Sequence, residues 1–272
     1  MTEQQAKIAQ VATSSPQVFK RKEKKYLLGG EKWQSLVAAL GAGLQIDDRG
    51  STLITSLYLD TADRLLIRRS VEKPDFKEKL RIRAYGNLFS DQQPVYLENK
   101  KKLVGTVYKR RVCMTMQEAR HFVESGIMPT SPFRANTAEK TLNCQILNEM
   151  LWTLERYDRP KPAIRLSYER CAYTYHEGGA ALRLTVDCAI KYRPGSWVMT
   201  GEAFEDAQIG SQSEPTYEDR PLLPQGSCLM EIKCSGSMPL GLSKVMAKLD
   251  IYPQSFSKVG RAYMALENEV EL

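Results

Sequence analysis

Histidine is scarce in this chain of 272 residues, which contains only His121 and His176. With so few imidazole groups, a His-rich zinc site and a Ser-His or Cys-His nucleophile are both poorly supported. A metal site is therefore expected to use oxygen ligands, which suit hard cations. The six cysteines form no C-x-x-C pair, and we expect free thiols of a reducing compartment rather than a disulfide framework.

Long apolar segments are also lacking. No apolar run approaches the roughly 20 residues that span a bilayer. The N-terminal stretch "MTEQQAKIAQVATSSPQ" has neither the basic region nor the apolar core of a signal peptide. The chain contains no G-x-x-x-x-G-K-[ST] motif, which argues against a Walker-type nucleotide site. We expect a cytoplasmic protein in which residues 1–17 form a flexible leader and residues 18–272 form one domain.

Basic residues are in modest excess. The chain has 39 Lys and Arg against 32 Asp and Glu, which gives a formal net charge of +7. Such an excess favours anionic partners such as nucleic acid, acidic membranes or phosphorylated small molecules. The positions of the basic residues must decide among them.

The order of expected elements indicates the fold class. Strands are expected at residues 19–28, 52–60, 78–86, 94–102, 106–114, 163–175, 180–190 and 228–235, and helices at 30–43, 117–126, 137–157, 239–250 and 255–268. Residues 201–226, rich in Gly, Ser, Pro and acidic residues, are expected to form a long loop. Strands in runs, rather than strands alternating with helices, predict an antiparallel α+β architecture.

The expected strands carry their charges on one face. Because side chains alternate along a strand, Leu80 and Ile82 point to one side and Arg81 and Arg83 to the other. The motif E-x-K, which puts an acid and a base on the same face, occurs at residues 23–25, 98–100 and 231–233. Six strands with this pattern predict a sheet whose polar face is rich in Lys and Arg.

A sheet of this kind has two possible arrangements. It can lie open as a docking platform, or it can curl into a barrel with the charges inside and the helices covering its apolar outer face. Guanidinium and ammonium groups inside a barrel are too costly unless a polyanion or water compensates them. A basic tunnel therefore predicts a ligand with many anionic oxygens, and a Glu among the cations is best explained as a ligand of a divalent cation that bridges phosphoryl oxygens.

Eight segments together resemble a known family. In order along the chain they are "KRKEKKYLL", "SLYLDT", "LRIRAYG", "YLENKKKLVGTVYKRR", "IRLSYERCAY", "LRLTVD", "LMEIKCS" and "FSKVGRAY". They resemble the catalytic domain of the vacuolar transporter chaperone (VTC) polyphosphate polymerases, in the triphosphate tunnel metalloenzyme superfamily. The resemblance implies an eight-stranded antiparallel β-tunnel covered by helices. It also implies transfer of the γ-phosphoryl group of ATP onto a growing polyphosphate chain, assisted by Mn²⁺ or Mg²⁺.

The resemblance also implies roles for individual residues. Glu231 would bind the metal, with Lys233 beside it. Lys25, Arg83 and Lys258 would take part in catalysis. The residues that would bind phosphate or nucleotide are Lys25, Arg81, Arg83, Lys100, Lys109, Tyr168, Arg170, Arg183, Lys233 and Lys258.

Several points stay open at the level of the sequence. Asn99 stands where an aliphatic or basic residue is common in the family. Glu98 and Asp187 are expected to pair with neighbouring cations, whereas Glu23 could pair or bind metal, and Tyr58 could line the tunnel or belong to a turn.

Two other functions compete with the polymerase. A hydrolase of the same fold would release phosphate from tripolyphosphate or a nucleoside triphosphate. A non-catalytic module would bind a polyanion. The acids of the E-x-K motifs would repel a nucleic-acid backbone, so no nucleic-acid partner is expected. The expected partners are ATP and inorganic polyphosphate, with a separate membrane protein as a further candidate.

Overall fold

The computed structural model describes residues 22–72, 74–88, 90–134, 137–199, 217–234 and 236–270, so the expected leader at 1–17 lies outside the described residues. The strands are β1 (Lys22–Leu28), β2 (Leu44–Asp60), β3 (Phe76–Tyr85), β4 (Pro94–Leu103), β5 (Thr106–Thr115), β6 (Lys161–Glu177), β7 (Ala180–Pro194), β8 (Arg220–Pro221) and β9 (Cys228–Cys234). The helices are α2 (Gly30–Leu40), α3 (Leu65–Glu72), α4 (Met116–Ser125), α5 (Thr137–Arg156), α6 (Leu240–Lys248) and α7 (Lys258–Val270), with 3-10 turns η1 (Gly41–Gly43) and η2 (Ser131–Arg134).

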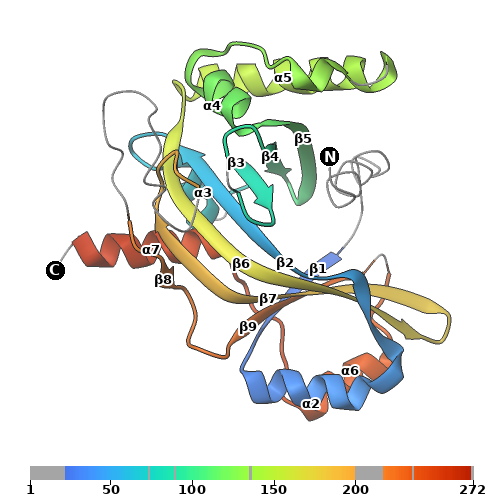
Figure 1. The fold of residues 1–272 in the computed structure, drawn as a ribbon. Helices are drawn as coiled ribbons and strands as arrows, with labels where there is room; N and C mark the ends of the chain where they lie inside the picture. The colour runs from blue at the N-terminus through green and yellow to red at the C-terminus, as the bar shows by residue number, and fades with distance from the viewer. Residues whose placement is uncertain are drawn as a thin grey trace.

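The strands form one antiparallel sheet (Figure 1). Eight of them follow in the order β1-β9-β7-β6-β2-β3-β4-β5, and the two-residue β8 pairs with β7. The predicted α+β class with an eight-stranded antiparallel sheet is confirmed. β8 falls within the expected loop at 201–226, of which residues 201–216 are outside the description.

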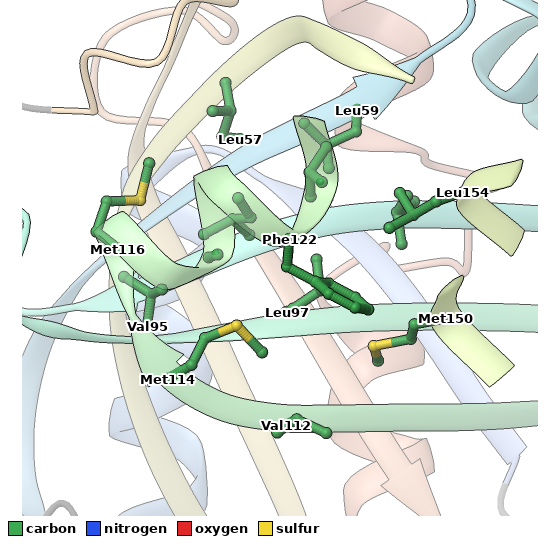
Figure 2. Packing of buried hydrophobic residues seen from close by; sticks show 14 of the residues in the cluster. Leu57, Leu59, Val95, Leu97, Val112, Met114, Met116, Phe122, Met150 and Leu154 are labelled. Carbon is green, nitrogen blue, oxygen red and sulfur yellow. The ribbon is translucent and has the colours of Figure 1, made fainter. Parts of the chain in front are cut away.

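The apolar face of β3, β4 and β5 packs under α4 and α5. Leu97 from β4 is buried with Phe122 of α4 and Met150 of α5 (Figure 2), and Leu80 and Ile82 from β3 belong to the same buried cluster. These strand residues are the ones that alternation along the sequence assigns to the face opposite the arginines. Their burial therefore fixes the direction in which Arg81 and Arg83 point.

A second apolar layer covers the other end of the sheet. Met230 and Ile232 of β9 pack with Leu36 of α2 and Leu242 of α6. The two helices lie together beneath this part of the sheet (Figure 1). Glu231 and Lys233 alternate with the buried β9 residues and consequently face the opposite side.

Helix α7 packs on the charged side of the sheet. Its Val259 and Ala262 are buried with Leu229 of β9 and with Leu166 and Tyr168 of β6. Helix α7 therefore adds a cover on the inner side to the expected covers of the apolar outer face. The inner face of β6 and β9 is itself apolar at one end, and α7 covers that end.

The two edge strands of the sheet, β1 and β5, do not pair with each other among the described residues. Among the described residues β1 pairs only with β9, and β5 pairs only with β4. The backbone N–H of Gln254 donates to the carbonyl of Lys25 at 2.7 Å, so the segment before α7 lies along β1. A pocket of about 510 Å³ is lined by Lys24 and Lys25 of β1, Lys102 of β4 and residues 253–256. The sheet thus curls into a tunnel-like shape.

Candidate active site

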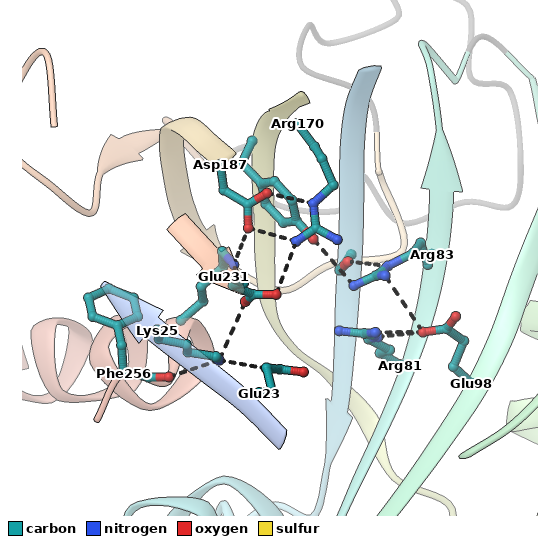
Figure 3. A network of polar contacts seen from close by, with 12 residues as sticks. Glu23, Lys25, Arg81, Arg83, Glu98, Arg170, Asp187, Glu231 and Phe256 are labelled. Atoms are coloured by element: carbon teal, nitrogen blue, oxygen red, sulfur yellow. Dashed lines mark hydrogen bonds and ion pairs between the residues drawn. The ribbon is translucent and has the colours of Figure 1, made fainter. Parts of the chain in front are cut away.

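Polar side chains from eight strands of the curled sheet, all except β8, meet on its inner face. They form two groups that face each other (Figure 3). One group belongs to β1, β9, β7 and β6, and the other to β2, β3, β4 and β5. The alternation of side chains and the register of the pairs produce this gathering, because Lys25 lies opposite Glu231 on β9, and Arg170 lies opposite Asp187 on β7.

Glu231 is the centre of the first group. One of its oxygens lies 3.5 Å from the ammonium nitrogens of both Lys25 and Lys258, and the other lies 3.8 Å from Arg170. Burial alone would raise the pKa of Glu231, but Lys258, Lys25 and Arg170 hold it well below its usual range. Glu231 is therefore a carboxylate at neutral pH.

Asp187 joins the same group. Its carboxylate accepts two hydrogen bonds from Arg170, at 2.6 and 2.7 Å, and also contacts the ammonium group of Lys258. Arg170 and Lys258 therefore each contact both buried acids. Lys258 is the first residue of α7, so the packing of that helix on the inner face brings its ammonium group into the site.

Glu98 is the centre of the second group. Arg81 donates to one of its oxygens through Nε at 2.8 Å and Nη2 at 2.6 Å, and Lys109 lies 2.7 Å from the other. Arg83 is further away, at 4.0 Å. Burial would raise the pKa of Glu98, but Arg81, Arg83 and Lys109 lower it well below its usual range. The expected pairing of Glu98 with neighbouring cations is confirmed.

Tyr168 lies between the two groups. Arg83 donates through Nη2 to the Tyr168 hydroxyl at 3.4 Å and through Nε to the Ser56 hydroxyl at 3.2 Å. The cationic groups of Lys258 and Arg170 lie 4.7 and 5.3 Å from the centre of the Tyr168 ring. The ring stabilises both cations by a cation–π interaction and so connects the two groups.

Tyr58 lies beside the second group. Its hydroxyl accepts a hydrogen bond from Nη1 of Arg81 at 2.9 Å. Burial alone would raise the pKa of Tyr58, but the positive charges of Arg81, Lys79 and Arg83 lower it to about 7. The open question about this residue is thus answered: it lines the charged face. Its sequence neighbour Asp60 instead accepts hydrogen bonds from the first N–H groups of α3.

Comparison with known proteins identifies the family. The family model of the VTC domain matches residues 20–267. The chain belongs to the VTC domain family. This confirms the resemblance drawn from the sequence, and with it the triphosphate tunnel type of fold.

Solved structures of related shape are distant. A candidate adenylate cyclase from Bacillus halodurans is 14% identical, covers 87% of this chain and 95% of its own, and has a TM-score of 0.43. The PH1819 protein from Pyrococcus horikoshii is 13% identical over 92% of this chain and 98% of its own, with a TM-score of 0.39. No curated protein matches the chain. These structures say nothing about what this VTC domain binds.

Most of the predicted site residues of the VTC domain lie together. Lys25, Arg170, Lys258, Tyr168 and Glu231 are in the first group or next to it, and Arg81, Arg83 and Lys109 are in the second.

Three predicted residues lie towards the rim. Arg183 is 58% exposed and pairs with Asp47 at 3.7 Å. Lys100 is exposed on β4, beyond Glu98. Lys233 is half-buried opposite Glu23 on β1, and its pKa is lowered, first by burial. Of these three residues, Arg183 differs most from the buried cations around Glu98 and Glu231, because its side chain is largely in solvent.

Lys79 belongs to the site, although the sequence analysis did not single it out. Its ammonium group donates to the hydroxyl of Ser257 at 3.2 Å. Burial is the main reason that its pKa is lowered to about 8, and repulsion from Lys100, Lys25 and Arg81 adds to this. The alternation that places Arg81 and Arg83 on the inner face also includes Lys79, two positions earlier, so the signal was present.

The acidic residues of this VTC domain fit a divalent cation of the kind its family implies. The described residues contain no cluster of three or more His, Cys, Asp or Glu that could enclose a metal. Glu231 makes only long contacts with its cations, from 3.5 to 3.8 Å, so its oxygens retain coordinating capacity. Mg²⁺ is commonly bound by one or two carboxylates completed by substrate phosphates and water, and Glu231 fits that role.

Proposed function

We propose that this VTC domain is a polyphosphate polymerase, which transfers the γ-phosphoryl group of ATP onto the end of a growing polyphosphate chain. The observation that supports the proposal most directly is the excess of cations on the inner face. The carboxylates there are Glu23, Glu98, Asp187 and Glu231, and they are outnumbered by Lys25, Lys79, Arg81, Arg83, Lys109, Arg170, Lys233 and Lys258.

The distribution of these cations favours an extended ligand. They come from β1, β9, β6, β3, β5 and α7 rather than from one loop. A single phosphate would be satisfied by one such cluster, as at a helix N-terminus. A linear chain with one negative charge per phosphoryl group matches cations spread over facing walls.

Three cations are proposed to act on the transferred group: Lys25, Arg83 and Lys258. Phosphoryl transfer depends mainly on positioning and on neutralising charge at the phosphoryl oxygens. Lys25 is oriented by the carbonyl of Phe256 at 3.0 Å, and Arg83 by Ser56 and Tyr168. These contacts hold the cations in place before substrate arrives, which reduces the reorganisation needed during the reaction.

The metal is proposed to bind at Glu231, with Asp187 close by through their shared contact with Lys258. A bound Mn²⁺ or Mg²⁺ would supply Lewis-acid withdrawal of charge from the transferring phosphoryl group. In its presence Lys258 and Arg170 would keep their contacts with Asp187, which are shorter than those with Glu231.

The central carboxylates of the site are poor general bases for hydrolysis. Hydrolysis is helped by a base that takes a proton from the attacking water. Glu98 and Glu231 have pKa values well below their usual range, which makes them weak bases. The terminal phosphate of a polyphosphate chain is already ionised and needs no such base.

The test is to incubate the purified protein with ATP and Mn²⁺ and to separate polyphosphate from orthophosphate on a gel. Chains together with ADP would support the polymerase, and orthophosphate without chains would support the hydrolase. If ATP is not consumed and the protein binds polyanions in a salt-sensitive manner, the non-catalytic module would be supported. Omission of the metal provides the control for non-enzymatic breakdown.

A further inference from the structure

The β4–β5 hairpin ends in an apolar tip whose side chains are exposed to solvent. Leu103 is 48% exposed, Val104 74%, Val107 37% and Tyr108 40%. The four residues lie in the stretch "KKKLVGTVYKRR", where the strands turn back on each other between Leu103 and Thr106. Single exposed apolar residues need no explanation, but these four gather at one hairpin end, with Leu103 and Tyr108 on one face of the hairpin and Val107 on the other.

The backbone conformation of this turn is unfavourable for Val104. Val104 has φ 43° and Gly105 has φ 81°, so both central residues of the two-residue turn are in the left-handed region. Such turns favour Asn or Asp followed by Gly, and a β-branched residue there is strained. The most exposed apolar side chain of the hairpin therefore occupies a position where a polar residue would be more stable. Its presence there is explained if the apolar side chain itself is needed.

Basic residues surround the tip on both strands. They are Lys100, Lys101 and Lys102 on β4 and Lys109, Arg110 and Arg111 on β5. Lys101, Lys109 and Arg110 have ion-pair partners within the domain. Within the described part of the chain no carboxylate pairs with Lys100 or Lys102, so this collar carries positive charge that an external anion can meet.

We propose that the hairpin tip docks this domain on a lipid bilayer that contains anionic lipids. Leu103, Val104 and Val107 would enter the boundary between headgroups and acyl chains, and Tyr108 would lie at the interface, where tyrosine is enriched. The basic collar would contact the anionic headgroups. A bilayer is the occupant that this composition fits, because it offers an apolar layer for the exposed aliphatic side chains and anionic headgroups for the basic residues beside them.

This docking would also orient the tunnel. Lys102 belongs to the hairpin and lines the pocket at the seam between β1 and β4. A domain held by the tip would therefore present that end of the tunnel towards the membrane. The inference rests on the exposed hairpin and does not depend on the proposed polymerase activity.

The experiment uses Val104→Asn in the full chain. Asn suits the left-handed turn, so the variant is expected to fold with an unchanged or raised melting temperature. Binding is measured by co-sedimentation with vesicles of phosphatidylserine and phosphatidylcholine. We expect binding roughly tenfold weaker than that of the wild type, because the variant loses an apolar side chain from the inserted tip. The matched control is Ile127→Asn, whose side chain is 64% exposed elsewhere on the surface and whose binding should equal the wild type's.

The variant keeps every Lys and Arg, so a loss of binding is not explained by attraction of anionic vesicles to the tunnel. Wild-type binding should also be much weaker with vesicles of phosphatidylcholine alone. Equal binding of Val104→Asn and wild type would overturn the proposal. So would equal binding to neutral and anionic vesicles. A wild type that binds neither kind of vesicle would likewise overturn the proposal.

Discussion

Arg83 is the residue whose contacts differ most clearly from those of a surface arginine. It is buried, it donates to Ser56 and Tyr168, and it stays 4.0 Å from Glu98. We predict that Arg83→Ala lowers kcat/KM for ATP at least about tenfold, or about 1.4 kcal/mol of transition-state stabilisation. The fold should survive, because Glu98 keeps Arg81 and Lys109 as partners. Turnover and circular dichroism check both statements, and wild-type turnover in a folded variant would refute the role.

The hydroxyl of Tyr58 gives the site a proton-linked response. Its pKa of about 7 is set by cations that a bound polyanion would screen, so binding should favour the protonated, neutral form. As pH rises from 6 to 8 the phenolate forms in the free protein and weakens anion binding. We predict that the affinity for polyphosphate falls over this range by up to about tenfold more in the wild type than in Tyr58→Phe.

Lys79 also titrates near this range, with a pKa of about 8 that the neighbouring Tyr58 phenolate raises, so Tyr58→Phe would lower the pKa of Lys79 as well. Both proteins in the comparison therefore also carry Lys79→Arg, whose guanidinium group stays charged throughout. Isothermal calorimetry at several pH values measures the two slopes. Identical slopes would mean that Tyr58 stays protonated throughout, contrary to this account.

Glu231 is the residue on which metal dependence is proposed to rest. Glu231→Gln keeps the size of the side chain and removes its charge. We predict loss of nearly all metal-dependent turnover, with retained or tighter binding of preformed polyphosphate, because one repulsive carboxylate is gone. Turnover against Mn²⁺ concentration and polyphosphate affinity should be measured together. Glu155→Gln on the exposed side of α5 is the matched control, and an unchanged metal response in Glu231→Gln would place the metal elsewhere.

At the level of the elements, the start of α4 is stabilised by one carboxylate. Glu118 accepts the backbone N–H groups of Thr115, Thr130 and Ser131 and closes a capping box with Thr115. Burial opposes this, but the hydrogen bonds from Ser131 and from these N–H groups lower the pKa of Glu118 to about 2. We predict that Glu118→Gln lowers the free energy of unfolding by about 1–2 kcal/mol at pH 7.

The pH dependence of that difference follows from the direction of the pKa shift. A folded-state pKa below the ordinary value of 4.5 gives stability that is complete above about 4.5 and is lost as pH falls towards 2. The gap between wild type and Glu118→Gln should therefore narrow below pH 4 in urea unfolding. Glu124→Gln on the same helix, which loses only a surface pair with Arg120, should change stability little. A constant gap down to pH 3 would contradict the assignment.

Alternation along the sequence predicted the strands best where one face is buried and the other charged. β3 and β4 meet this condition, and their boundaries and faces agree with the structure. β2 begins at Leu44, eight residues before its expected start, because Asp47, Asp48 and Gly50 interrupt the pattern at a bulge. Helix α3 was missed because it spans only eight residues.

The same alternation of apolar and charged side chains made the gathering of cations on the inner face predictable. It did not predict the position of each cation along the tunnel. Arg183 shares the inner face with Asp187, yet it lies nearer the β6–β7 turn, where the sheet is open to solvent. Alternation of side chains specifies which face of the sheet a residue lies on, but not how far along the tunnel it lies. The position of α7 inside the curl, which brings Lys258 to the acids, depends on apolar inner residues of β6 and β9 that no single strand reveals.

For the molecule as a whole, the distribution of charge determines anion binding more than the net charge does. A net charge of +7 over 272 residues is modest, but many of the cations lie on the concave inner face of the sheet. Helices α2, α4, α5 and α6 cover its apolar outer face. The described helices include none long and apolar enough to cross a bilayer. A curled sheet with this inner surface suits a ligand that extends through it. The exposed β4–β5 hairpin at one end suits the proposed contact with an anionic bilayer.

The central claim is that the tunnel transfers phosphoryl groups to a phosphate chain rather than to water. The direct measurement follows the label of γ-³²P-ATP with Mn²⁺ and compares label in chains with ADP released. The account predicts one chain-bound phosphoryl group for each ADP, with little labelled orthophosphate, and loss of both products in Glu231→Gln. Release of one labelled orthophosphate for each ADP, with no label in chains, would contradict it.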